Sequence, residues 1–244
     1  MPYIKEICVA GNTIEISKYF SYRYHCPETD RHKKEELTSE AMKRINQRNA
    51  VKRLRRLLNT NFSDGDYLIR TDFNKVSVKD SVEMQTLTAK AIRKIKNAYR
   101  KNGLEFKYVY VKEIGPKGSK HLHMVCNRAD VSLISDNWPY GYIHLDVLSS
   151  DGQYAKIAEY FIKYANKTEQ TEGILVGKRW YGSRNLLKPK ISKKVIKSKR
   201  FKEDPKDKRG YYVDKNSICY GISELTGFEY FTYTLIKIIK PPGG

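Results

Sequence analysis

The sequence predicts an α+β fold: an antiparallel sheet with the split β-α-β, ferredoxin-like strand order and with its helices on one face. Two observations predict this class. From residue 66 onward, segments of strand and helix character follow one another in the order β-α-β-β-(short helix)-β-α. Hydrophobic residues make up 40% of the 244-residue chain, enough for a packed core. No apolar run reaches the ~18 residues that a membrane-spanning helix needs.

The first 60 residues are expected to form short strands and a basic helix that packs on the core. Strand-forming residues occur at 14–16 and 19–24. Thr38 or Ser39 is a suitable N-cap for a helix that runs to about Leu58. Apolar residues recur in this helix at helical spacing, and lysines and arginines fill its other face.

The core domain is expected at residues 61–187. Turn residues separate its strands, and capping signals bound its helices. Gly103 is a suitable end for the first helix, and the turn at 115–118 joins two strands into a hairpin. The predicted strands lie at 67–73, 106–114, 121–126 and 139–148, and the predicted helices at 80–101 and 151–167.

Residues 188–244 are expected to form a basic tail with a β-like C-terminal segment. Lysines dominate residues 188–209, where apolar residues are few. Aromatic and β-branched residues, which favour strands, return from Tyr211 onward.

Positive charge is the strongest global feature of the chain. Lys and Arg total 47 against 27 Asp and Glu, a formal net charge of +20. Such a charge favours a polyanionic partner, because each neutralised phosphate releases condensed counterions. The 19 tyrosines add rings on which unpaired bases can stack. The composition therefore favours nucleic-acid binding, and the lack of a phosphate-cradling Gly-rich loop with Lys-Ser/Thr argues against a nucleotide cofactor.

Two histidines and a carboxylate define the first candidate site. His121 and His123 alternate along a predicted strand, so both point to one face while Leu122 points into the core. Glu113 lies on the other strand of the hairpin, within reach across the ladder. Two imidazoles and one carboxylate can hold a divalent cation and leave positions open for a phosphodiester. A His-x-His pair by itself is a weak signal, since most such pairs bind nothing.

Two tyrosines define the second candidate site. Tyr160 and Tyr164 lie four residues apart on the predicted helix, so their rings stand one above the other. Lys156, Lys163 and Lys167 fall on the same helical face. Neighbouring ammonium groups favour the phenolate, which is the nucleophilic form of a side chain with an ordinary pKa near ~10. The helical wheel favours Tyr160 as first nucleophile; the alternative is a structural helix whose tyrosines lie between core and surface.

Together, the two sites resemble the HUH endonucleases, which are named for two histidines around a bulky hydrophobic residue. The resemblance rests on the Glu113 and His121-Leu122-His123 hairpin and on the motif Tyr-Phe-Ile-Lys-Tyr-Ala-Asn-Lys about 40 residues later. Within that superfamily the chain is most similar to the two-tyrosine rolling-circle replication initiators of single-stranded DNA phages and related mobile elements. The resemblance covers about residues 66–167 and extends less specifically to 46–49 and 180–184.

The resemblance implies a metal-dependent enzyme that nicks and rejoins DNA. His121 and His123, with Glu113 as third ligand, would hold Mg²⁺ or Mn²⁺. One tyrosine would attack the origin phosphodiester and leave a 5′-phosphotyrosine link with a free 3′-OH. The second tyrosine would repeat the transfer after one round, and Lys163 would steady the phosphate or help to deprotonate the phenol.

The resemblance also implies the partners. The substrate would be single-stranded DNA or an origin hairpin, with a host helicase and polymerase acting alongside. A bacterial host cytoplasm is the expected location, since the chain start lacks an apolar signal-peptide core. The candidate DNA contacts are basic residues of the two helices and of the segment after the tyrosine helix: Arg48, Lys52, Lys156, Lys167 and Arg184.

One departure from the family pattern and two alternatives stay open. In such initiators the strand before the first long helix usually carries a hydroxyl-rich run, whereas here residues 68–72 read Leu-Ile-Arg-Thr-Asp. An HUH relaxase or transposase is the first alternative; relaxases commonly use three histidines and an N-terminal tyrosine, and compact transposases one tyrosine. A non-catalytic module that stacks single-stranded nucleic acid on its tyrosines is the second.

Overall fold

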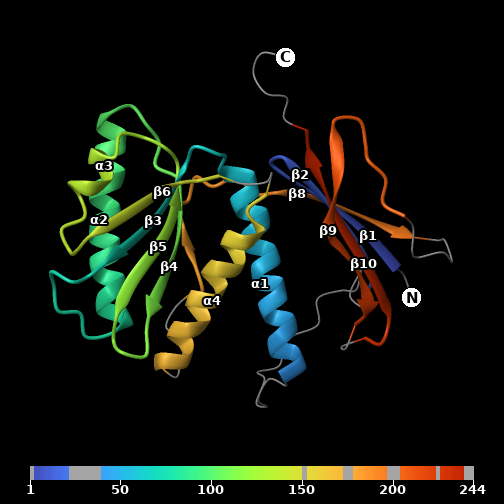
Figure 1. Ribbon diagram of the computed structural model, residues 1–244, viewed down its shortest axis with the longest axis horizontal. Helices are drawn as coiled ribbons and strands as arrows, with labels where there is room; N and C mark the ends of the chain where they lie inside the picture. The colour runs from blue at the N-terminus through green and yellow to red at the C-terminus, as the bar shows by residue number, and fades with distance from the viewer. Residues whose placement is uncertain are drawn as a thin grey trace. The chain divides into compact units, whose positions relative to one another are not determined.

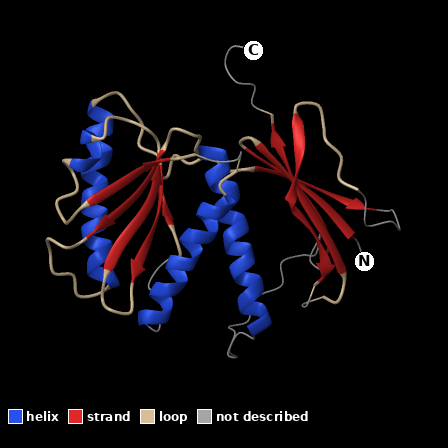
Figure 2. Cartoon of the chain, in the orientation of Figure 1, coloured by secondary structure: helices blue, strands red, loops and turns tan. Residues whose placement is uncertain are grey.

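The chain folds into two compact units. The computed structural model describes residues 3–21, 40–149, 153–172, 178–196, 204–223 and 226–238. One unit is the central segment Asn61–Leu187, and the other combines Met1–Thr60 with Lys188–Gly244. Each unit contains a five-stranded antiparallel sheet together with helix (Figures 1 and 2), which confirms the predicted α+β class.

The sheet of the central unit has a split β-α-β order. Its strands are β3 (Tyr67–Asp72), β4 (Tyr108–Ile114), β5 (Lys120–Cys126), β6 (Ile143–Val147) and β7 (Tyr181–Gly182). They lie in the order β6-β3-β5-β4-β7, and all neighbours run antiparallel. The long helix after β3 leads to β4, but in the sheet β5 lies between β3 and β4. This separation is what the term split refers to.

One face of this sheet packs on α2 (Ser81–Lys101) and on the short helix α3 (Ser132–Ser135). The shared core includes Ile69 of β3, Leu122 of β5 and Ile95 of α2, all with no exposed surface. The helix α2 begins where the Asp80 carboxylate accepts hydrogen bonds from the N–H groups of Val82 and Glu83, at 2.9 and 2.8 Å. The predicted position of Leu122 in the core is therefore confirmed.

The helix α4 (Ala155–Glu172) lies on the opposite face of the same sheet (Figure 1). Thr168 fastens it to β4: its hydroxyl accepts from the Ile114 N–H at 3.0 Å and donates to the Lys112 carbonyl at 3.0 Å. The prediction that the helices share one face is wrong for α4. The physical reason is that β4 and β5 are apolar on both faces, with Val109, Val111 and Val125 buried on the α4 side, so both faces need a cover.

The second unit brings the two ends of the chain into one sheet. Its elements are β1 (Tyr3–Ala10), β2 (Thr13–Phe20), α1 (Glu40–Asn61), β8 (Lys190–Ile196), β9 (Tyr211–Ile222) and β10 (Glu229–Lys237). The strand order is β8-β1-β2-β10-β9. The segment expected as a basic tail thus supplies three strands.

Some predictions for this unit fall outside the described residues. The strand expected at 19–24 is seen as β2 up to Phe20, and residues 22–24 are not described. The N-cap candidates Thr38 and Ser39 are also outside the described ranges, and α1 continues to Asn61, beyond the predicted end. Within the described ranges, no helix is both long and apolar enough to cross a membrane.

The helix α1 meets β1 and β2 through a buried cluster of charges. The Arg56 guanidinium lies 2.7 Å from Glu6 Oε1 and 2.6 Å from Glu15 Oε1. Arg55 and Lys52 also pair with Glu15, whose side chain is 5% exposed. Burial by itself raises the pKa of Glu15, but the three cations lower it to about 2. This cluster therefore holds the carboxylates ionised at the helix–sheet contact.

Candidate functional site

The β4–β5 hairpin places both histidines and the carboxylate on one face. Glu113 lies opposite His121 in the ladder, and His123 is two residues farther along β5. The turn closes through hydrogen bonds from Gly115 N to Ser119 O at 2.8 Å and from Gly118 N to Gly115 O at 2.9 Å. Gly118 has φ +77°, a conformation that favours glycine. This turn fixes the register that aligns the three side chains.

The helix α4 brings both tyrosines to His123. Tyr160 Oη lies 3.4 Å from His123 Nδ1, and the two rings meet edge to face with centroids 5.2 Å apart. The Tyr164 ring stacks on the His123 imidazole with centroids 4.3 Å apart. The two phenol rings are 4.4 Å apart. The structure therefore joins the two candidate sites into one.

His123 links the carboxylate to the phenol. Its Nε2 lies 2.8 Å from Glu113 Oε2, and its other nitrogen faces Tyr160. Burial, with the charges of His121 and Arg70, lowers the pKa of His123 below its ordinary value although Glu113 raises it, which favours the neutral ring at pH 7. An ionised Glu113 accepts the Nε2–H, which assigns Nδ1 as the acceptor for the Tyr160 hydroxyl.

Glu113 has an ammonium partner as well as the imidazole. Lys167 Nζ lies 2.5 Å from Glu113 Oε1 and 5.7 Å from the centroid of the Tyr164 ring. Burial by itself raises the pKa of Glu113, but hydrogen bonds from Lys167 and His123 hold it below its ordinary value. Lys167, predicted as a DNA contact, is therefore the ion-pair partner of Glu113 in this structure.

Tyr160 is a weaker acid than an exposed tyrosine. Burial raises its pKa, and the hydrogen bond to Tyr164 and the charge of Glu113 raise it further. The Arg70 guanidinium acts in the opposite direction. Because the resting phenol holds its proton strongly, a nucleophilic role requires additional positive charge beside the oxygen.

The donor set suits a divalent cation. A carboxylate and two imidazoles are ligands that such ions accept, and His121 Nδ1 is buried without a hydrogen-bond partner among the described residues. The ring centroids of His121 and His123 are 6.4 Å apart. In the described part of the chain, however, no group of three or more His, Cys, Asp or Glu is arranged to hold an ion. In the resting arrangement Glu113 and His123 instead hydrogen-bond to each other.

The other predicted residues lie at the surface of one unit or the other. Lys156 and Lys163 are exposed on α4, and neither makes a hydrogen bond or ion pair with another described residue, so the role of Lys163 stays a prediction. Arg184 is exposed just after β7. Arg48 and Lys52 belong to the other unit, where Arg48 is exposed and Lys52 pairs with Glu15 at 2.9 Å.

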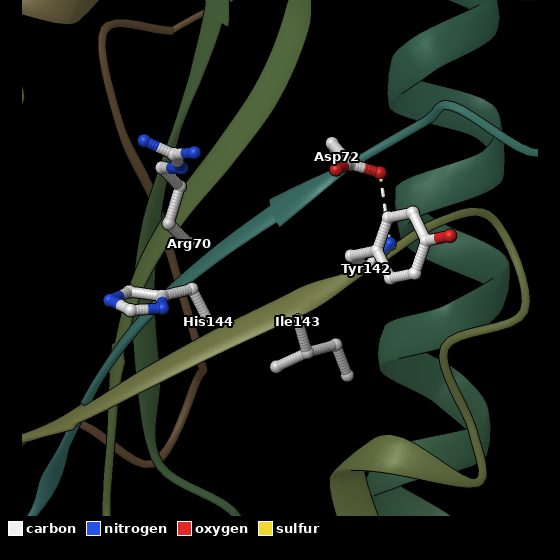
Figure 3. Close-up of a pocket in the computed structure, with 5 residues that line it drawn as sticks. All are labelled: Arg70, Asp72, Tyr142, Ile143 and His144. Carbon is white, nitrogen blue, oxygen red and sulfur yellow. Dashed lines mark hydrogen bonds between the residues drawn. The ribbon is translucent and has the colours of Figure 1, made fainter.

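Sequence reasoning missed a pocket on β3 and β6 (Figure 3). Its volume is about 370 Å³, and its lining residues are Arg70, Asp72, Tyr142, Ile143 and His144. The alternation along β3 puts Arg70 and Asp72 on one face, which is visible in the sequence. The sequence does not show which strands pair with β3. The positions of Tyr142 and His144 near Arg70 could therefore not be predicted from it.

Residues 76–169 match the family described as Replication-associated protein ORF2/G2P. The match spans less than half of the chain, and it includes Glu113, both histidines and both tyrosines. No curated protein and no solved structure matches the chain. The similarity of this segment is consistent with a rolling-circle replication initiator.

Proposed function

We propose that this protein initiates rolling-circle replication by nicking single-stranded DNA at an origin and rejoining it, through an HUH-type tyrosine mechanism. The observation that carries the proposal is the contact of both α4 tyrosines with one buried imidazole. Tyr160 Oη is 3.4 Å from His123 Nδ1, and Tyr164 stacks on the same ring at 4.3 Å. The match of residues 76–169 to replication-associated proteins supports the same role.

Tyr160 is the proposed first nucleophile. Its oxygen attacks the phosphorus, a phosphorus–phenol bond forms and the bond from phosphorus to the 3′ oxygen breaks. The 3′ oxygen takes up a proton and becomes the free 3′-OH, and the phenol proton passes to solvent. Tyr160 is 37% exposed, which leaves its hydroxyl open to both DNA and water. Before the attack, His123 Nδ1 accepts a hydrogen bond from the Tyr160 hydroxyl, which orients its oxygen.

Tyr164 is the proposed second nucleophile. Its ring lies 4.4 Å from that of Tyr160, so both phenols reach one phosphate-binding position. With one tyrosine linked to the 5′ end of the strand, the other is free to attack the regenerated origin after one round. The released 3′-OH then attacks the first phosphotyrosine, which closes the circle and frees the first tyrosine, while the enzyme stays linked to the new 5′ end through the second.

Glu113, His121 and His123 would hold Mg²⁺ or Mn²⁺. A bound divalent cation supplies the positive charge that stabilises a phenolate and an attacked phosphate. To act as ligands, Glu113 and His123 would have to give up their mutual hydrogen bond, and Lys167 would have to release Glu113. His121 Nδ1, which is buried and unpaired among the described residues, would gain a partner.

The proposed reaction needs partners that the chain does not supply. No phosphate-cradling loop for ATP appears in the sequence, so strand separation falls to a host helicase. The free 3′-OH would be extended by a host polymerase, and the proposed location of the reaction is the cytoplasm of a bacterial host.

A cleavage assay tests the proposal. Labelled single-stranded oligonucleotides that tile the DNA around the gene are incubated with the protein in Mn²⁺, Mg²⁺ or EDTA. The wild type is expected to give metal-dependent cleavage and a covalent protein–DNA band. His121→Ala and the double variant Tyr160→Phe/Tyr164→Phe are expected to lose both.

The matched control is Tyr154→Phe, a tyrosine directly before the first residue of α4. The Tyr154 hydroxyl bonds to Asp64 at 3.0 Å, and its ring is buried. This variant is therefore expected to keep the covalent band. Tight binding of the oligonucleotides with no covalent band in any metal would contradict the proposal and favour a non-catalytic binding module.

A further inference from the structure

The pocket on β3 and β6 lies on the same sheet face as the candidate site. In the ladder, Arg70 faces His123 on one side and His144 on the other. Opposed residues of neighbouring strands point to the same side of a sheet. Figure 3 shows Arg70 and His144 next to each other, with Ile143 pointing the other way. A row of side chains therefore runs from the pocket to the imidazole that contacts Tyr160.

A cation and two rings in this pocket are open to solvent. Arg70 is exposed, and its guanidinium has no hydrogen bond or ion pair with any residue that the structure describes. Tyr142 is 69% exposed, and Lys75 Nζ lies 5.5 Å from the centroid of its ring. The His144 side chain is 72% exposed. An unpaired guanidinium beside exposed rings suits a phosphate with an unpaired base attached.

The carboxylate of the pocket is engaged with neighbouring polar groups. Asp72 Oδ1 accepts hydrogen bonds from the N–H of Tyr142 at 2.9 Å and of Asn74 at 3.2 Å. Asp72 Oδ2 accepts from Asn74 Nδ2 at 2.9 Å. Asp72 therefore fixes the backbone of Tyr142, and Arg70 is the charged group of the pocket that a ligand can engage.

Arg70 lies close to the proposed nucleophile. It stands opposite His123 in the ladder, and Tyr160 Oη lies 3.4 Å from His123 Nδ1. A phosphate bound at Arg70 would therefore lie one strand away from the imidazole that contacts Tyr160.

We propose that the β3–β6 pocket is a subsite for single-stranded DNA next to the scissile position, in which Arg70 binds a backbone phosphate and Tyr142 stacks on a base. This inference rests on the proposed nicking function and names the surface that holds its substrate. The net charge of +20 favours a polyanion, and an exposed ring needs an unpaired base, which a DNA duplex does not offer.

Binding in EDTA tests the subsite separately from cleavage. Fluorescence anisotropy measures the Kd of a labelled single-stranded oligonucleotide, either one that the protein cleaves or oligo-dT, at several salt concentrations. The variants are Arg70→Gln, Tyr142→Ala and Tyr142→Phe. The matched control is Arg93→Gln, an exposed arginine of α2, the helix that covers the other face of the sheet.

Three results are expected. Arg70→Gln weakens binding and lowers the slope of log Kd against log salt by about 0.7, the value for one phosphate of a single strand. Tyr142→Ala weakens binding by about fivefold or more, as loss of one stacked base predicts, and Tyr142→Phe restores it. Arg93→Gln binds as the wild type does. Circular dichroism melting shows that each variant is folded.

Two results would overturn the subsite. In the first, Arg70→Gln and Tyr142→Ala bind the oligonucleotide with the same Kd as the Arg93→Gln control. In the second, the wild type shows no measurable binding to single-stranded DNA. Failure of the proposed function looks different. If the wild type forms no covalent adduct but these variants still lose affinity, the nicking proposal fails and the subsite stands.

Discussion

Replacing Glu15 by Gln should loosen the contact between α1 and its sheet, because it removes one carboxylate from a buried cluster that also contains three cations. The Glu15 side chain is 5% exposed and pairs with Lys52, Arg55 and Arg56. Glutamine keeps the size of the side chain but removes its negative charge. Glu6 is then the carboxylate of the cluster that remains to balance the three cations. Breaking a buried ion pair by removing one partner costs about 3–5 kcal/mol.

The pKa of Glu15 gives an independent magnitude. It falls from 4.5 to about 2 in the folded chain. At about 1.4 kcal/mol per pKa unit, the ionised form contributes about 3 kcal/mol to folding. Because the folded pKa lies below the unfolded one, this stabilisation is complete above the unfolded pKa and is lost as the pH falls. About 2 kcal/mol of it should be gone at pH ~3.

Urea unfolding of the full chain at several pH values measures this effect. Hydrogen exchange of peptides from β1, β2 and α1 assigns it to this unit. The control is Glu40→Gln, which removes an exposed pair with Lys43 and should leave stability unchanged. The reasoning is refuted if Glu15→Gln costs less than about 1 kcal/mol at pH 7, or if the gap between variant and wild type does not shrink in acid.

Three further predictions concern the central unit. Gly141→Ala should lower the free energy of unfolding by about 1–3 kcal/mol, because a Cβ there would stand 1.9 Å from Asp72 Oδ1 and 2.5 Å from Asp72 O; an unchanged urea midpoint contradicts this. Lys167→Gln should tighten Mn²⁺ binding severalfold in calorimetry, because its ammonium no longer competes for Glu113; weaker binding contradicts this. The initial rate of covalent adduct formation should rise with pH from about 7 to 9. The reason is that the pKa of Tyr160 lies above its ordinary value near ~10, so more phenolate forms as the pH rises. A rate that levels off at neutral pH contradicts this.

Local signals in the sequence were sufficient for the elements that carry them. Asp80 and Gly103 bound α2 because a side-chain cap and a glycine stop act within a few residues. By contrast, β8 is rich in exposed lysines, and it is a strand because it pairs with β1, where Cys8 lies opposite Ile191. The residue pattern of β8 does not show that it pairs with a strand so far away in the sequence.

The face that α4 covers was also beyond local reasoning. Helical spacing identified the apolar side of α4, and Ala158 and Phe161 are indeed fully buried. It did not say which face of the sheet receives that side. Apolar residues on both faces of β4 and β5 are the signal that a cover was needed on each.

For the candidate site, the part within one hairpin was the most predictable. Glu113 and His121 face each other across a short turn, so sequence spacing fixes their register. The pairing of Lys167 with Glu113 depends on where α4 docks, and the row from Arg70 to His144 depends on β6 pairing with β3. Both are tertiary events that spacing along the chain does not encode.

The central claim is that a tyrosine of α4 becomes covalently linked to the 5′ end of cleaved DNA, and peptide mapping of the trapped adduct tests it most directly. Trypsin cuts after Lys156, Lys163 and Lys167, so Tyr160 and Tyr164 fall in different peptides. After nuclease trimming, mass spectrometry should find a nucleotide on the Tyr160 peptide of the wild type and on the Tyr164 peptide of Tyr160→Phe. A nucleotide on a residue outside α4, or cleavage that leaves no peptide modified, would contradict the account.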